Sequence, residues 1–208
     1  MFIYGQFHSS QSNIIMENEL FAFLAQYMTL TDDEKRAITD LDIFRSFKKG
    51  TILLSEGERS DEGYFVMRGC LRSYYVIEGE EKTTAFYTEA ESLTPMCVVT
   101  DEPSKYYIAC VEDSTLIISK GSMEAVIFEK FPRFQMLCRL LSEDLLAKNQ
   151  ATLDDFKLSS PEQRYLNLLK TRPDLVQRVP QHQLASYLGI KPQSLSRLRA
   201  RILEKAKE

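Results

Sequence analysis

The stretch that most constrains the fold of this chain is Pro180–Ile202, where two short amphipathic segments flank Gly189. Two crossed helices must bury apolar side chains where they meet and need small residues where they come close together. The residues at these positions are Leu184, Ala185, Leu188, Ile190, Leu195 and Leu198. Gly189 stands where the first helix has to stop, because glycine takes a left-handed turn there without steric cost. Two helices joined by such a short turn form a helix-turn-helix. We predict this motif here, and we expect the upstream chain to hold and control it.

The second helix of this motif presents a polar face suited to DNA bases. Pro192 fits its first turn, and at about 100° per residue Leu195, Leu198 and Ile202 point into the unit. The outward face carries short side chains, one glutamine and one arginine, namely Gln193, Ser196, Arg197 and Ala200, and Ser194 and Arg201 lie on its flanks. In the major groove, glutamine can pair with adenine and arginine with guanine. We therefore predict that Gln193, Ser194, Ser196 and Arg197 face bases.

Basic residues flank this face and suit phosphates, which fix register without reading sequence. Lys191 is a poor N-cap whose charge opposes the helix dipole at a cost of up to about 1 kcal/mol, and a nearby phosphate would turn that cost into a gain. The predicted DNA-binding residues are Gln181, Lys191, Pro192, Gln193, Ser194, Ser196, Arg197, Arg199 and Arg201. The alternative is that these are solvated charges on a small helical domain.

The charge distribution agrees with DNA binding at one end. Residues 1–160 hold 16 Lys and Arg against 26 Asp and Glu, whereas residues 161–208 hold 10 against 4. An acidic body with a basic end is the expected footprint of a protein that touches nucleic acid there, although a solvated basic face would look the same. The apolar share of 44% indicates a folded protein. With no membrane-length apolar run and no signal-peptide pattern at the start, we expect a cytoplasmic protein and no membrane partner.

The cysteines and histidines offer little chemistry. Cys70, Cys97, Cys110 and Cys138 are widely spaced without a C-x-x-C pair, so we expect buried free thiols and no metal. His182 precedes Ser186 by one helical turn, but both residues lie inside the predicted helix-turn-helix. A glycine-rich phosphate loop is also missing from the sequence. We predict that the protein is not an enzyme and needs no cofactor.

Upstream, helical and β-type patterns alternate. An apolar stripe predicts a helix from Glu17 to Met28, and Thr31 with Glu34 forms a capping box for a second helix that ends near Asp40. Between Asp42 and Ser119 the pattern changes to short β-type runs: Phe44–Phe47, Thr51–Leu54, Gly63–Met67, Cys70–Ile77, Lys82–Thr88, Tyr106–Cys110 and Ser114–Ser119. Short strands at this spacing, punctuated by glycine, predict an antiparallel sandwich or barrel.

Helical periodicity returns from Lys120 to Phe131 and, after Pro132, from Arg133 to about Phe156. The apolar stripe of this long helix is wide enough to cover more than one surface, and we predict that it packs on the barrel and on a second copy of itself. The predicted dimer interface is Phe134, Leu137, Cys138, Leu141 and Leu145. The alternative is a helix buried within its own chain, because the heptads are not clean. Ser160 and Pro161 then mark the start of a further helix.

These features together resemble the Crp/Fnr family of bacterial transcription regulators. The resemblance is carried by residues 47–58 (FKKGTILLSEGE), 64–72 (YFVMRGCLR), 108–114 (IACVEDS) and the helix-turn-helix, and the ending resembles the Bacteroidetes-type branch. It implies an α+β fold with an antiparallel jelly roll of cyclic-nucleotide-binding type, a long dimerisation helix and a C-terminal winged helix-turn-helix. The corresponding domains are residues 1–131, 132–158 and 159–208.

The chain departs from this family in the phosphate-binding segment. Members that bind cyclic AMP use a Gly-Glu pair and an Arg-Ser/Thr pair, whereas residues 91–107 lack Gly-Glu and have Ser104-Lys105 instead of the second pair. Lysine offers a point charge instead of a bidentate fork, and Glu91, Asp101 and Glu102 repel an anion. We therefore expect no cyclic AMP, and the candidate pocket for an unidentified ligand is Tyr64, Tyr87, Ser104 and Lys105.

The sequence thus predicts a homodimeric, sequence-specific regulator that binds near-palindromic double-stranded DNA. The resemblance leaves RNA polymerase open as a further partner. The alternative is a small-ligand sensor whose C-terminal domain contacts proteins instead of DNA.

Overall fold

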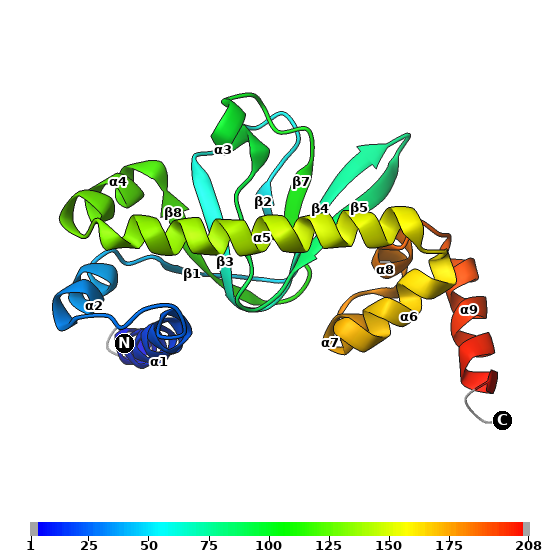
Figure 1. Ribbon diagram of the computed structural model, residues 1–208, viewed down its shortest axis with the longest axis horizontal. Helices are drawn as coiled ribbons and strands as arrows, with labels where there is room; N and C mark the ends of the chain where they lie inside the picture. The colour runs from blue at the N-terminus through cyan, green and yellow to red at the C-terminus, as the bar shows by residue number, and fades with distance from the viewer. Residues whose placement is uncertain (1–3, 206–208) are drawn as a thin grey trace.

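The computed structural model describes residues 4–205, and it describes the side chains of residues 14–204. The elements in chain order are α1 (Tyr4–Leu24), α2 (Asp32–Thr39), β1 (Phe44–Phe47), β2 (Ile52–Leu54), β3 (Glu62–Arg68), β4 (Leu71–Ile77), β5 (Glu80–Tyr87), β6 (Ser92–Leu93), α3 (Met96–Thr100), β7 (Tyr107–Cys110), β8 (Ser114–Lys120), α4 (Gly121–Lys130), α5 (Arg133–Leu158), α6 (Pro161–Thr171), α7 (Pro173–Arg178), α8 (Gln181–Tyr187) and α9 (Pro192–Lys205). Helices therefore occupy both ends of the chain, and the strands lie between them (Figure 1).

The strands form two four-stranded antiparallel sheets with the orders β1-β8-β3-β6 and β2-β7-β4-β5. Their inner faces share one apolar cluster, in which Leu54, Val66, Leu71, Ile108 and Leu116 are at most 2% exposed. Two sheets that enclose a common core form a sandwich or barrel. The predicted antiparallel β-domain is thus confirmed.

The long helix α5 runs along the whole molecule, with the barrel beside it, α1 and α2 at one end and α6–α9 at the other (Figure 1). Its first turns are held by the N-terminal helices, because Phe134 and Leu137 are buried in one cluster with Leu20 and Leu24 of α1. Both residues were predicted to contact a second copy. In the structure their own N-terminal helices already cover both side chains, which leaves little of either for a second copy.

The N-terminal helix also differs from its prediction. The sequence predicts Glu17–Met28, whereas α1 starts at Tyr4 and ends at Leu24. Its buried stripe is Met16, Leu20 and Leu24, each four residues after the last, and Tyr27 lies beyond the helix and is exposed. Residues four apart share one helix face, so this stripe packs on α5 while the chain turns at residues 25–28. The prediction counted Tyr27 as part of this stripe and therefore put the helix end four residues too late.

The capping box before α2 is confirmed and has a further partner. The Thr31 backbone N–H donates to Glu34 Oε2 at 2.8 Å, and the Glu34 N–H donates to Thr31 Oγ1 at 3.3 Å. Arg133, at the start of α5, donates to both carboxylate oxygens of Glu34 at 2.6 and 2.7 Å. Because Glu34 belongs to α2 and Arg133 to α5, this ion pair joins the two helices. The Glu34 side chain is 3% exposed, so solvent screens its carboxylate little. A charge-assisted bidentate contact of this kind is among the stronger hydrogen-bond arrangements in proteins.

We expect Glu34→Gln to weaken the fold and to reduce its acid sensitivity. Burial would raise the pKa of Glu34, but the hydrogen bonds from Arg133 and Thr31 outweigh it and lower the pKa below its usual value. A carboxyl with a lowered folded pKa stabilises the fold above its unfolded pKa, roughly 4.3, and loses that stabilisation as the pH falls through the folded pKa. Glu34→Gln should therefore lose roughly 2 kcal/mol at pH 7.

Urea unfolding between pH 7 and pH 3 measures this effect. The free energy of unfolding should fall less steeply below about pH 4.3 in Glu34→Gln than in wild type. Glu143→Gln is the control, because Glu143 is exposed and its ion pair with Arg139, one turn away on the same helix, is 3.7 Å long. Equal acid sensitivity of Glu34→Gln and wild type would contradict the assigned role of the carboxylate.

Candidate nucleic-acid interface

Helices α8 and α9 and the turn between them form the predicted helix-turn-helix geometry. Gly189 has φ +72°, in the left-handed region, as the sequence predicts. The Gly189 N–H donates to the Ser186 carbonyl and the Ile190 N–H to the Ala185 carbonyl, both at 3.0 Å. These bonds satisfy carbonyls that the end of α8 would otherwise leave unpaired. A side chain at Gly189 would also approach the Phe156 ring, at 3.4 Å from a Cβ.

Apolar side chains from both helices hold this unit together. Leu184, Ala185, Leu188 and Leu195 are at most 2% exposed, and Leu198 is 6% exposed. They share one cluster with residues of α6 and α7, and Ile190 and Ile202 pack against its edge. The predicted core of the motif is confirmed. Because these leucines point inward, the polar residues between them on α9 point outward.

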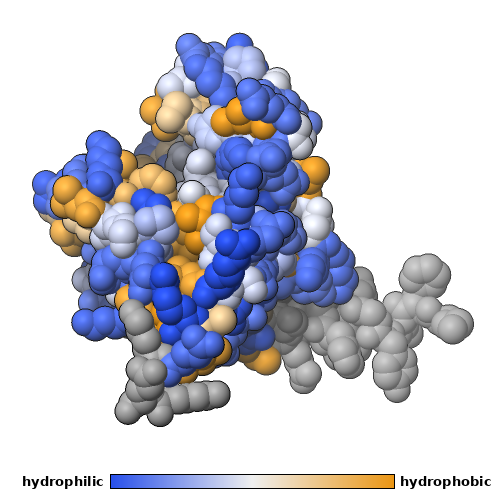
Figure 2. All heavy atoms as spheres, turned by 90° about the vertical axis from the view of Figure 1, so that its right-hand side faces the viewer, coloured by the Kyte–Doolittle hydropathy of each residue, from blue (hydrophilic) through white to orange (hydrophobic). Residues whose placement is uncertain are grey.

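The outward face of α9 carries the residues predicted to read bases. Gln193, Ser194, Ser196 and Arg197 are all exposed. So are the other predicted contact residues Gln181, Lys191, Pro192 and Arg201, whereas Arg199 is half-buried. Arg201 is paired with Glu162 at the start of α6, so a phosphate would have to compete with that carboxylate. The end of the molecule that carries α8 and α9 is mainly hydrophilic, with hydrophobic residues in separate patches (Figure 2).

Two features near this face were not expected from the sequence. The Glu80 carboxylate, at the tip of the β4–β5 hairpin, has its pKa lowered mainly by Lys82 and also by Lys191, which places the acidic tip near the turn before α9. In addition, residues 161–205 form helices and no strand. The wing that the resemblance implies would need strands, and none lies in this part of the described chain.

The candidate ligand pocket is not assembled as one open site. Tyr64 is 3% exposed in the barrel core, Tyr87 packs against the same cluster, and burial raises the pKa of Tyr64 to about 12. The Ser104 hydroxyl donates to the Tyr106 carbonyl at 2.7 Å and is buried. Lys105 points away from the core, with its side chain 76% exposed and 3.8 Å from Glu102. Tyr64 and Tyr87 lie in or against the apolar cluster between the two sheets, which includes Leu54, Val66 and Leu71.

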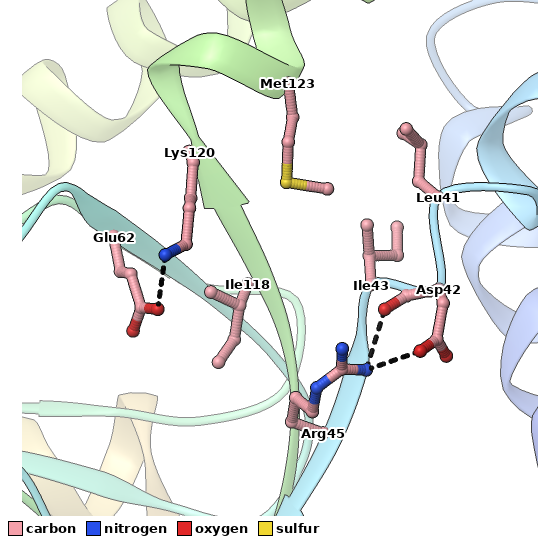
Figure 3. Close-up of a pocket in the computed structure, with 8 residues that line it drawn as sticks. All are labelled: Leu41, Asp42, Ile43, Arg45, Glu62, Ile118, Lys120 and Met123. Atoms are coloured by element: carbon pink, nitrogen blue, oxygen red, sulfur yellow. Dashed lines mark hydrogen bonds and ion pairs between the residues drawn. The ribbon is translucent and has the colours of Figure 1, made fainter.

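An open pocket of about 360 Å³ lies elsewhere, between the loop before β1, the end of β8 and the start of α4 (Figure 3). Ile43, Ile118 and Met123 supply apolar lining. Its charged groups are paired with one another: Lys120 Nζ lies 3.2 Å from Glu62, and Arg45 lies 3.2 Å from Asp42 (Figure 3). The predicted ligand residues are not among those that line this pocket.

The described residues also bear on catalysis and membranes. Burial raises the pKa of the Cys70 thiol to about 12 and that of Cys110 to about 11, so neither is a thiolate at neutral pH. The Ser186 hydroxyl is engaged by strand β5, one turn from the exposed His182. Among the residues whose side chains are described, 14–204, no cluster of three or more His, Cys, Asp or Glu is placed to hold a metal ion. No helix within residues 4–205 is long and apolar enough to span a membrane.

The predicted dimer residues share one side of α5 but differ in how far their own chain covers them. Cys138 is exposed, Leu141 and Leu145 are partly buried, and Phe134 and Leu137 are buried as described above. Two exposed leucines of α5 lie outside the predicted dimer interface. Leu146 and Leu153 are 71% and 46% exposed. They are seven residues apart, with the exposed Asn149 between them. This heptad spacing is the signal in the sequence that would have identified them.

Comparison with known proteins assigns the β-domain. Residues 44–130 match the family model of the cyclic nucleotide-binding domain, which covers β1 to α4. No curated protein sequence matches the chain.

Solved structures share the fold over a larger part of the chain. The global regulator CLP of Xanthomonas campestris, described as c-di-GMP responsive, superposes with a TM-score of 0.65 at 13% identity, over 85% of this chain and 93% of that one. FixK2 of Bradyrhizobium japonicum gives 0.64 at 16% identity, over 78% and 85%. CooA of Carboxydothermus hydrogenoformans gives 0.61 at 18% identity, over 78% and 76%. The chain therefore has a mixed helix and antiparallel-sheet architecture with a cyclic nucleotide-binding fold.

Proposed function

We propose that this protein is a homodimeric, sequence-specific DNA-binding transcription regulator of Crp/Fnr type. One observation carries the proposal: α9 buries Leu195 and Leu198 and exposes Gln193, Ser194, Ser196 and Arg197 on the opposite side. In a helix-turn-helix, the N-terminal part of the second helix contacts base edges in the major groove. Short serine side chains let the helix approach closely, and the longer glutamine and arginine reach bases.

The phosphate contacts would come from the edges of the same unit. Lys191 lies at the start of α9 and Gln181 at the start of α8, and both are exposed. Arg201 would add a contact after leaving Glu162, and the half-buried Arg199 has the least freedom to do so. We assign DNA recognition to residues 159–208, whose own net charge is positive although that of the whole chain is −4. The residues proposed to face bases and phosphates gather at one end of the molecule, and this arrangement favours DNA over a protein partner.

We propose that two copies pair through α5 along the exposed seam of Leu146, Asn149 and Leu153. Exposed leucines seven residues apart form one stripe, which a second helix covers by knobs-into-holes packing. An asparagine within such a seam favours one defined register and a pair of helices over larger assemblies, at some cost in stability. Two copies would present two α9 helices to a near-palindromic site with half-sites about one helical turn apart.

We further propose that the β-domain does not bind cyclic AMP. Ser104 uses its hydroxyl on its own backbone, Lys105 points outward beside Glu102, and the barrel interior is apolar. A cyclic phosphate would need a fork of donors inside the barrel, which these residues do not supply. We also propose that the protein has no enzymatic activity, since the Cys70 and Cys110 thiols are buried and the Ser186 hydroxyl is bonded to β5.

We expect Arg197→Ala to lose roughly 1–3 kcal/mol of binding free energy at one base position of the DNA site. Arg201→Ala should weaken binding to all DNA sequences alike and lower the salt dependence of the affinity. The decrease in salt dependence should be smaller than for one full phosphate contact, because Glu162 competes for Arg201. The measurement is fluorescence anisotropy across salt concentrations, with DNA selected by the wild-type protein and single-base variants of that DNA. Arg139→Ala on α5 is the control.

Two outcomes would contradict the assignment. If Arg197→Ala binds the selected site and its variants as wild type does, Arg197 does not read a base. If the wild-type protein shows no salt-dependent binding to any DNA, the alternative of a sensor with a protein-contacting C-terminal domain gains support.

A further inference from the structure

The helices α6–α9 do not stand apart from the β-domain. Cys70, Phe86 and Val111 of the β-domain are at most 6% exposed in one cluster with Tyr165 and Leu175 of the helices. The ring of Tyr187 in α8 also meets that of Phe86 edge-on, with centroids 5.3 Å apart. A continuous core of this kind holds two units in one relative orientation, because interiors are close-packed and do not deform continuously.

Arg178, at the end of α7, joins the two units by a forked contact. Its guanidinium donates to both carboxylate oxygens of Glu89 at 2.8 Å, to Glu112 Oε1 at 3.0 Å, and to the Gly69 carbonyl at 2.8 Å. The side chain is 23% exposed, so solvent screens these bonds only in part. Arginine suits such a site because its planar fork fixes direction as well as charge.

Arg172, at the other end of α7, makes a second contact of the same type. It donates to Thr88 Oγ1 at 2.6 Å and to Glu91 Oε2 at 3.0 Å, with 27% of its side chain exposed. Glu91 in turn accepts from the Thr88 backbone N–H at 2.6 Å. The turn between β5 and β6 is therefore held from two directions. We call Arg172 and Arg178, with Thr88, Glu89, Glu91 and Glu112, the arginine clamp.

A third contact continues this arrangement into the helix-turn-helix. The Ser186 hydroxyl of α8 accepts from the Thr83 N–H and donates to the Glu81 carbonyl, both at 2.9 Å. Strand β5 is at the edge of its sheet, so α8 occupies backbone groups that would otherwise face solvent. All of these contacts leave the outward face of α9 exposed.

We propose that Arg172 and Arg178 are positioning residues for DNA recognition, which fix the direction of α9 relative to the rest of each subunit and so set the half-site spacing that the dimer accepts. This inference rests on the proposed function. A dimer whose reading helices are fixed can match only one separation and one rotation of two half-sites. Loosening the clamp would let each α9 reorient and would broaden the accepted spacing.

The test is a spacing series. Binding is measured to a selected DNA with two half-sites and to versions lengthened at the centre by one, two, three and five base pairs. Two added base pairs rotate one half-site by about 70°, so wild type should lose roughly tenfold or more in affinity. The variant Arg172→Met/Arg178→Met should lose less than roughly threefold across the same step, with weaker binding to the best site. The control Arg36→Met/Arg59→Met removes two exposed ion pairs elsewhere and should keep the wild-type profile.

Stability is measured on the same samples, because a purely structural role would lower it without changing the spacing profile. Arg178→Lys, which keeps the charge but loses the fork, should give an intermediate profile. If the double variant does not fold, Arg172→Met carries the same test. A steep wild-type profile shared by the clamp variants would overturn the positioning role and leave the proposed function intact. Absence of DNA binding by wild type would instead overturn the proposed function, and the inference with it.

Discussion

The variant Leu146→Glu/Leu153→Glu should be a monomer, and its affinity for DNA with two half-sites should fall by roughly 10²–10⁴. In a two-fold interface each seam residue meets its own counterpart or a near neighbour, so four glutamates would gather where apolar side chains are expected. Burying unpaired carboxylates is far less favourable than burying leucine. Sedimentation velocity measures the state of assembly, and anisotropy measures the affinity. The affinity falls because a dimer binds its second half-site without further loss of translational freedom, whereas two monomers bind the two half-sites independently.

A matched control is available on the same helix. Leu140 and Leu158 are also exposed, at 42% and 85%, and they lie on a face about 120° from the seam. Leu140→Glu/Leu158→Glu adds the same charge to the same helix and should remain a dimer. If both double variants dissociate, general charge repulsion explains the result. If neither does, the proposed seam is wrong.

Gly69→Ala should destabilise the protein by roughly 3 kcal/mol or more. Gly69 turns the chain between β3 and β4 with φ +107°, which L-residues rarely adopt. A Cβ there would lie 2.7 Å from the Cα of Ser114, so backbone would have to move. Its carbonyl also accepts from Arg178 and its N–H donates to Glu89, so the turn belongs to the contact between the two units.

Urea unfolding of Gly69→Ala and Gly121→Ala checks this expectation. Gly121 starts α4, its added Cβ would meet no atom within 4 Å, and its φ is outside the positive range. Gly121→Ala should therefore be neutral or slightly stabilising, because alanine restricts the unfolded chain more than glycine does. A loss for Gly69→Ala no larger than about 1 kcal/mol would mean that the turn between β3 and β4 adapts easily.

Local signals in the sequence predicted the elements well wherever one short stretch contains all the relevant atoms. The capping box of Thr31 and Glu34 and the turn at Gly189 depend on neighbours within a few residues, and both are present in the structure. The glycine-punctuated β-runs likewise became two antiparallel sheets. The predicted end of α1 was wrong because an apolar stripe identifies the buried face of a helix. It does not identify the residue at which the helix ends.

The faces of α5 could not be divided from its sequence. Phe134, Leu137, Leu146 and Leu153 are all apolar, and the periodicity does not say which pair the N-terminal helices cover. The structure buries the first pair against α1 and leaves the second pair exposed. Helix faces are allocated by packing between elements distant in the chain, so this decision belongs to the tertiary structure.

The sequence alone determined the surface that we propose for DNA recognition, because the helical period puts Leu195 and Leu198 on one side and Gln193, Ser196 and Arg197 on the other. What surrounds this surface was decided only by the tertiary structure. Arg172 and Arg178 find their carboxylates 66 to 89 residues earlier in the chain, and no local pattern predicts those partners. An ion pair needs two groups within a few ångströms, and for groups so far apart in sequence only the folded chain supplies that proximity.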